Sequence, residues 1–124
     1  LGGGFARYST DTEWLAPHFE KMLYDNALLV STMCEAYQLT RSAKYARAIR
    51  ETLSFIQREL MHPEEGFFSA LDADSEGVEG KFYTWQKQEI EETLSAEDAA
   101  LCCAYYGISE EGNWEHTNIL HVRQ

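Results

Sequence analysis

The sequence predicts an all-α fold, made of helical hairpins that belong to a larger ring or open stack, with a small β-hairpin inserted between helices. Three observations support this prediction. Two long helical stripes of apolar residues are separated by a short polar break, an acidic glycine-containing segment lies between two aromatic runs, and a further helical pattern carries its own capping residues. A closed toroid and an open solenoid are both compatible with this pattern.

The first helix is predicted to begin at Pro17, because proline suits the first turn of a helix. It follows a glycine-rich loop in residues 1–16. Its apolar side chains recur at intervals of three and four residues, which is the spacing of one helical face. They are Phe19, Met22, Leu23, Ala27, Val30, Met33, Cys34 and Tyr37.

The second helix is predicted to start after Ser42, a good N-cap residue, and to end at His62 because Pro63 disfavours helix at the preceding position. Its apolar stripe is Tyr45, Ile49, Thr52, Leu53, Ile56 and Leu60. Two long helices with a short polar connection predict an antiparallel αα-hairpin.

The middle of the chain predicts a β-hairpin, with strands in residues 66–71 and 81–85 and an acidic loop in residues 72–80. Helical periodicity then returns around Ile90. Ser95 and Asp98 resemble a capping box, and Gly107 is placed to end the last helix. Residues 114–122 are expected to be extended.

Charge and cysteine content exclude several classes of protein. The formal charge is −11, with 21 acidic and 10 basic residues. Such a chain repels phosphate backbones, so we expect no nucleic-acid partner. No stretch approaches the roughly 20 apolar residues of a membrane span, so no membrane partner is expected either. No export signal is visible. The unpaired pattern of Cys34, Cys102 and Cys103 favours a reducing, cytoplasmic setting.

No metal or cofactor motif is evident. An EF-hand counted from Asp72 fails because its twelfth position, Tyr83, offers no bidentate carboxylate. A less regular cation site in the acidic loop and a solvated hairpin tip both stay open as alternatives. The chain begins without methionine, and we treat it as a piece of a larger protein. Apolar faces exposed in such a piece could cause self-association.

Ionisable and aromatic residues gather where the first helix is predicted to begin. The candidate catalytic residues are His18, Arg7 and Glu20, since a neutral histidine at a helix N-terminus can accept a proton. The alternatives are a packed histidine ring and a surface ion pair between Lys21 and Asp25. Aromatic rings beside polar groups are what a sugar-binding cleft requires. The candidate substrate-binding residues are Trp14, Lys21, Tyr24, Asp25, Asp72, Asp74 and Tyr83.

Six segments resemble one known family, the spermatogenesis-associated protein 20 family of thioredoxin-domain-containing proteins. They are residues 2–9 (GGGFARYS), 14–27 (WLAPHFEKMLYDNA), 66–70 (GFFSA), 72–77 (DADSEG), 79–83 (EGKFY) and 104–107 (AYYG). The resemblance implies a thioredoxin-like domain, absent from this chain, followed by a helical domain. That helical domain is similar to the (α/α)6 toroids of six-hairpin glycosidases and N-acylglucosamine 2-epimerases.

On this resemblance, residues 1–124 form part of such a toroid, and the candidate residues from Arg7 to Asp25 lie near its pocket with the hairpin of residues 72–83. Two positions depart from the family pattern. Ala6 stands where a histidine is expected, which removes one candidate base, and Gln86 stands where a helix-capping threonine is expected.

The expected function of the larger protein is carbohydrate-active, similar to a sugar epimerase or a glycosidase, with a small carbohydrate as its ligand. Epimerisation would need proton removal beside a carbonyl and proton return to the opposite face. The isolated piece is expected to be inactive. The alternative is a non-catalytic module that binds a glycan or a protein and is coupled to the thioredoxin-like domain.

Overall fold

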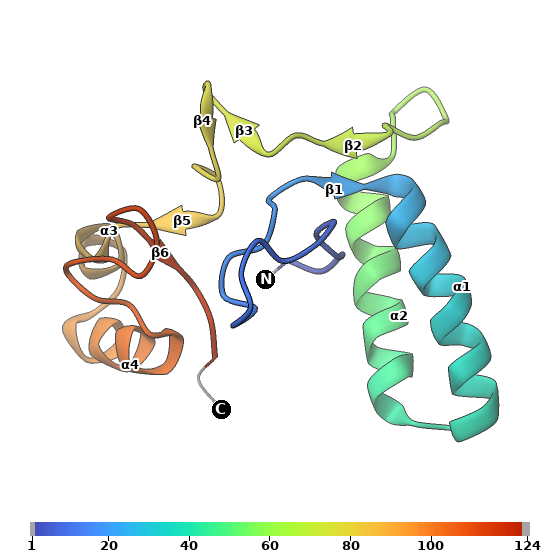
Figure 1. Ribbon diagram of the computed structural model, residues 1–124, viewed down its shortest axis with the longest axis horizontal. Coiled ribbons are helices and arrows are strands. Elements are labelled where there is room, and N and C mark those ends of the chain that lie inside the picture. Colours follow the sequence, from blue (N-terminus) through green and yellow to red (C-terminus); the bar gives the residue numbers. More distant parts are fainter. Residues whose placement is uncertain (1, 123–124) are drawn as a thin grey trace. The chain divides into compact units, whose positions relative to one another are not determined.

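The computed structural model describes residues 2–122. They form two compact units, each of which combines segments from different parts of the chain. The first unit contains residues 2–8 and 18–73, and the second contains residues 9–17 and 74–122. Figure 1 shows the elements of each unit.

The first unit is built on two antiparallel helices, α1 (Leu23–Thr40) and α2 (Ala43–Phe55), and a π-helical turn that continues α2, Ile56–Leu60 (Figure 1). α1 ends at Arg41, which has a left-handed backbone (φ 55°) and donates its N–H to the Tyr37 carbonyl at 2.8 Å. The backbone of Ser42 is extended at the start of α2. The predicted αα-hairpin is thereby confirmed.

The core of the first unit lies around the end of α2. Phe55, Ile56 and Leu60 are buried together, and Leu23 and Leu71 pack against them. The N-terminal glycine run approaches this part of α2 closely, because a Cβ atom on Gly3 or Gly4 would collide with the Glu51 carbonyl or the Phe55 ring. Glycine is thus required there by packing as well as by its positive φ.

The predicted start of the first helix is wrong. α1 begins at Leu23, and Pro17 instead forms an isolated β-bridge with Ser9. The two residues before α1 form strand β1 (Lys21–Met22), which pairs antiparallel with β2 (Ala70–Leu71). Strand pairing satisfies the backbone groups that a longer helix would have used, which explains why the apolar periodicity overestimated the helix.

The predicted pairing of residues 66–71 with residues 81–85 is wrong, because each of these segments pairs with a different part of the chain. β2 pairs with β1, and β5 (Thr84–Trp85) pairs with β6 (Asn118–Ile119). A hairpin lies instead inside the acidic loop, where β3 (Asp74–Ser75) pairs with β4 (Val78–Glu79). The two turn residues between these strands both have positive φ, which is the geometry of a type I′ turn.

The second unit packs its helices α3 (Lys87–Thr93) and α4 (Ala96–Tyr106) around Ile90, Ala99 and Ile108. The predicted caps of α4 are confirmed: the Ser95 hydroxyl accepts the Asp98 N–H at 3.2 Å, and Gly107 is left-handed. Gln86 caps α3 through a capping box with Glu89. The departure at Gln86 therefore keeps the capping function.

Across residues 2–122, the structure contains three small antiparallel strand pairs in addition to its helices. The helical prediction is confirmed, but the fold is mixed rather than purely α. No helix in this part of the chain combines the length and apolar character needed to cross a bilayer.

Candidate functional site

Three candidate side chains of the first unit lie beside Tyr8 where two short extended stretches run side by side. We call Arg7, Tyr8, His18 and Glu20 the Arg7 cluster. The Arg7 N–H donates to the Glu20 carbonyl at 3.2 Å, and the His18 N–H donates to the Tyr8 carbonyl at 2.9 Å. These backbone bonds hold the two stretches antiparallel and bring their side chains together.

Arg7 and Glu20 form the ion pair of this cluster. Arg7 Nη1 donates to Glu20 Oε2 at 2.9 Å, and the two side chains are 38% and 25% exposed. This hydrogen bond raises the pKa of Arg7, with a smaller contribution from the nearby phenol of Tyr24. The guanidinium is therefore permanently charged and uses one of its five N–H donors on Glu20.

His18 lies against Tyr8, with ring centroids 4.9 Å apart and planes inclined by 26°. Its Nδ1 atom is buried and has no hydrogen-bond partner within residues 2–122, although Glu20 Oε2 is 3.9 Å away. Because His18 precedes strand β1 and is not in α1, the argument from the helix N-terminus is wrong. The neighbours of its ring are instead an aromatic face and a carboxylate.

Asn26 is a site residue that sequence reasoning did not assign to any role. It is fully buried in α1, accepts the Phe5 N–H at 2.7 Å, and donates to the carbonyls of Phe5 at 3.1 Å and Met22 at 2.8 Å. It thereby fixes the backbone two residues before Arg7. The available signal was an amide side chain on a helix rich in apolar residues, since buried polar groups need partners.

Lys21 is also directed at the N-terminal segment. It is 8% exposed, and its Nζ donates to the Gly3 carbonyl at 2.8 Å and lies 4.8 Å from the centre of the Phe55 ring. Burial lowers the pKa of Lys21, and the charge of Arg58 acts in the same direction while Glu59 opposes it. The alternative of a surface pair with Asp25 is wrong, because Lys21 is buried and precedes α1.

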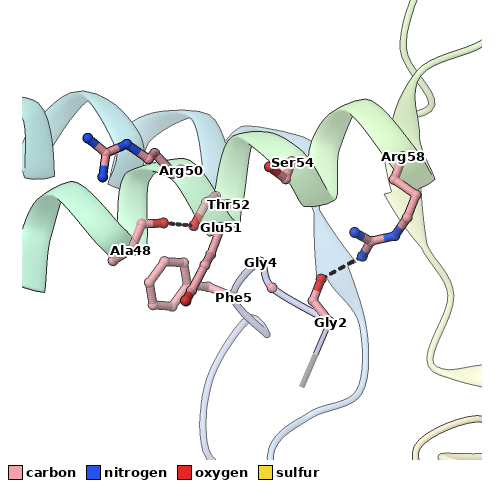
Figure 2. Close-up of a pocket in the computed structure, with 10 residues that line it drawn as sticks. Gly2, Gly4, Phe5, Ala48, Arg50, Glu51, Thr52, Ser54 and Arg58 are labelled. Atoms are coloured by element: carbon pink, nitrogen blue, oxygen red, sulfur yellow. Dashed lines mark hydrogen bonds between the residues drawn. The ribbon is translucent and has the colours of Figure 1, made fainter.

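A hollow of about 710 Å³ lies between the glycine run and α2 (Figure 2). Figure 2 shows Arg58 reaching across to the Gly2 carbonyl, to which it donates a hydrogen bond of 2.5 Å. The residues that line the hollow are Gly2, Gly3, Gly4, Phe5, Ala48, Arg50, Glu51, Thr52, Ser54 and Arg58. The lining carries charges of both signs, because it contains Glu51 together with Arg50 and Arg58.

The other candidate residues are distributed over both units. Tyr24 and Asp25 occupy the first turn of α1, and Asp72 follows β2 in the first unit. Trp14, Asp74 and Tyr83 belong to the second unit. Their proposed participation with the Arg7 cluster stays a prediction.

Trp14 lies at the tip of a tightly bonded loop in the second unit. Its side chain is 83% exposed, and its φ is 58°. The Asp11 carboxylate accepts the backbone N–H groups of Leu15 at 3.1 Å and Ala16 at 2.5 Å. The bonds from Ala16 and Leu15 lower the pKa of Asp11. The loop therefore presents the indole on a backbone that Asp11 holds.

In the acidic hairpin, Asp74 of β3 lies opposite Glu79 of β4. The Lys81 ammonium donates a hydrogen bond to the Glu76 carboxylate. The ring of Tyr83 meets that of Phe82 edge to face at 5.1 Å between centroids. Within the described residues, no group of three or more His, Cys, Asp or Glu side chains is arranged to hold a metal ion.

No protein-family model matches the chain. Over 91% of its length, the chain is 39% identical to spermatogenesis-associated protein 20 of Rattus norvegicus, and 38% identical to the proteins of the same name from Homo sapiens and Mus musculus. An uncharacterized protein of Caenorhabditis elegans is 35% identical over the same share of the chain. The chain spans 16% of the length of the three mammalian relatives and 17% of the nematode protein. Over the segment that it shares with these relatives, the chain belongs to the spermatogenesis-associated protein 20 family.

Proposed function

We propose that this chain contributes one wall of a sugar-binding pocket in a larger, carbohydrate-active protein similar to an epimerase or a glycosidase. The observation that supports this proposal is the Arg7 cluster, in which the Glu20 carboxylate pairs with the Arg7 guanidinium and lies 3.9 Å from the His18 imidazole, which stacks on the Tyr8 ring. Sugars are bound by charged and polar partners for their hydroxyl groups and by flat rings for their C–H faces.

The roles within the cluster follow from the chemistry of each group. His18 is the residue proposed to exchange a proton with the substrate, and Tyr8 holds its ring in place. Arg7 would hold an oxygen of the substrate, and Glu20 orients Arg7. A reaction that removes and returns a proton on opposite faces needs a second acid or base across the pocket. We therefore propose that the chain alone is inactive and that the toroid of the larger protein completes the pocket.

The exposed apolar side chains of α1 support the idea of a larger assembly. Leu28 is 66% exposed and Leu39 is 87% exposed, although both belong to a helix rich in apolar residues. In the proposal, further hairpins cover these side chains in the larger protein, and copies of the isolated chain associate through them. The cytoplasmic location is part of the same proposal and is supported by the three free cysteines of the described residues.

The proposal is tested with a panel of sugars and the full-length protein that contains this segment, using ligand-observed NMR and thermal shift. We expect at least one monosaccharide to bind, and we expect Arg7→Ala and His18→Ala to weaken that binding at least tenfold. Arg47→Ala is the matched control, because Arg47 forms an exposed ion pair on α2 in the same unit.

Two outcomes would contradict the proposal. If no sugar binds, the non-catalytic module that recognises a protein is the better interpretation. If a sugar binds and is turned over normally by both variants, the enzyme class stands but the Arg7 cluster is not its site.

A further inference from the structure

One carboxylate oxygen of Glu20 pairs with Arg7 and lies near a histidine nitrogen that has no hydrogen-bond partner among residues 2–122, and this arrangement points to the charge of the ligand. We infer that the sugar bound at the Arg7 cluster carries an anionic group, a carboxylate or a phosphate, which replaces Glu20 on Arg7 while Glu20 moves to a protonated His18. This inference rests on the proposed function, because it specifies the ligand of the same site.

Arg7 is accessible to such a ligand. Its side chain is 38% exposed, and its ion pair with Glu20 is formed through Nη1. A guanidinium binds carboxylate and phosphate groups through two parallel N–H donors, which is stronger and more directional than one contact. An anionic ligand can therefore form a better pair with Arg7 than Glu20 does in this structure.

Glu20 has an alternative partner within reach. The oxygen that accepts from Arg7, Oε2, is also 3.9 Å from His18 Nδ1, which is too long for a hydrogen bond. That nitrogen is buried and lacks a hydrogen-bond partner among residues 2–122. A shift of about 1 Å by the carboxylate would bring the two atoms to hydrogen-bond distance. Leaving Arg7 would thus satisfy a buried polar atom.

The exchange requires a proton. A carboxylate placed against Nδ1 favours a proton on that nitrogen and favours the charged imidazolium. The groups of the first unit that face His18 are Tyr8, through its ring, and Glu20, which is itself paired with Arg7. When the ligand's anion pairs with Arg7, His18 takes up one proton from the buffered solvent, and both negative groups then have a positive partner. A neutral sugar provides no replacement for Glu20 and takes up no proton.

The inference predicts a pH dependence that differs between ligands. Glucuronate is expected to bind the full-length protein at least tenfold more tightly than glucose at pH 6. Its Kd is expected to rise about tenfold between pH 6 and pH 8, because a carboxylate beside an imidazole favours the charged form by about that factor. Glucose 6-phosphate is measured at pH 6 alone, because its own phosphate changes charge within the pH range of the experiment. Comparison of its Kd with that of glucuronate shows whether the site prefers a phosphate or a carboxylate.

The variants isolate the carboxylate that moves. Glu20→Gln is expected to remove the pH dependence of glucuronate binding, since an amide does not stabilise the imidazolium in this way. Glu51→Gln makes the same chemical change at another ion pair of the first unit and is expected to keep the pH dependence. Calorimetry in two buffers of different ionisation enthalpy measures the proton uptake directly.

Each outcome decides between the inference and the proposed function. Equal binding of glucose and glucuronate, or a Kd for glucuronate that is the same at pH 6 and pH 8, would overturn the inference and leave the sugar site in place. If glucose, glucuronate, glucose 6-phosphate and every other sugar of the panel fail to bind, both the inference and the proposed function are overturned.

Discussion

Replacement of Asn26 by alanine is expected to destabilise the first unit by about 2–3 kcal/mol, because the side chain makes three hydrogen bonds of roughly 1 kcal/mol each and alanine recovers a few tenths through its higher helix propensity. The three bonds join Asn26 to both backbone groups of Phe5 and to the Met22 carbonyl, and the residue is fully buried. Alanine would leave these backbone groups without their side-chain partner in the protein interior.

The measurement is urea unfolding of the chain, followed by amide NMR signals of the first and second units separately. Thr32→Ala is the matched control, since Thr32 is an exposed residue of α1 whose hydroxyl bonds the Leu28 carbonyl in the same helix. Its expected cost is within about 0.5 kcal/mol. We also expect Asn26→Ala to perturb the signals of Arg7 and His18, because Phe5 leads into that cluster.

Equal stabilities of the Asn26→Ala and Thr32→Ala chains would refute the reasoning. So would a loss confined to the second unit, since every bond of Asn26 lies in the first. A loss of stability in the first unit without any change at Arg7 and His18 would show that Asn26 supports the fold but does not position the candidate site.

Three further predictions concern the glycine run, the loop of the second unit and the exposed face of α1. Gly4→Ala is expected to lower stability in urea unfolding by about 2–4 kcal/mol, through backbone strain plus a collision, whereas Gly77→Ala at the hairpin tip meets no atoms and should cost only about 1–2 kcal/mol; equal losses would contradict this. Because the folded pKa of Asp11 is depressed, its stabilising bonds are complete above the ordinary value of 3.8 and are lost as the pH falls through the lower folded value. The NMR signal of the Ala16 amide should therefore titrate below pH 3.8, and a midpoint above that value would be inconsistent with the bonds. Finally, Leu39→Ser should weaken self-association of the isolated chain in sedimentation experiments. Association through this face would be excluded if the variant associates as strongly as the wild type, or if the wild-type chain is purely monomeric.

Local features of the sequence predicted the helical hairpin and α4, although they placed the start of the first helix too early. Helical periodicity and a polar break predicted the αα-hairpin, and Ser95 and Gly107 predicted both ends of α4. These signals act between residues that are close along the chain, so a sequence pattern contains them completely. The sequence singled out Arg7, His18 and Glu20 as candidates, but the backbone pairing that brings them together joins segments ten or more residues apart and was not predicted.

Pairing between distant segments could not be inferred in the same way. Lys21 and Met22 continue a helical pattern in the sequence, yet they pair with Ala70 and Leu71 as strands. The 81–85 run contains a strand as expected, but its partner is Asn118–Ile119 rather than the preceding run. Alternation and periodicity identify which residues prefer a strand, whereas the choice of partner depends on tertiary packing.

The sequence by itself determined the αα-hairpin, both caps of α4, the acidic character of the chain and the residue types available for chemistry. Only the tertiary structure decided that α1 starts at Leu23, that Lys21 and Asn26 hold the N-terminal segment, and that Glu20 lies between Arg7 and His18. The physical reason is that helix propensity and capping act within a few residues, whereas the partner of a buried polar group is chosen by whichever distant backbone the packed core brings within hydrogen-bond distance.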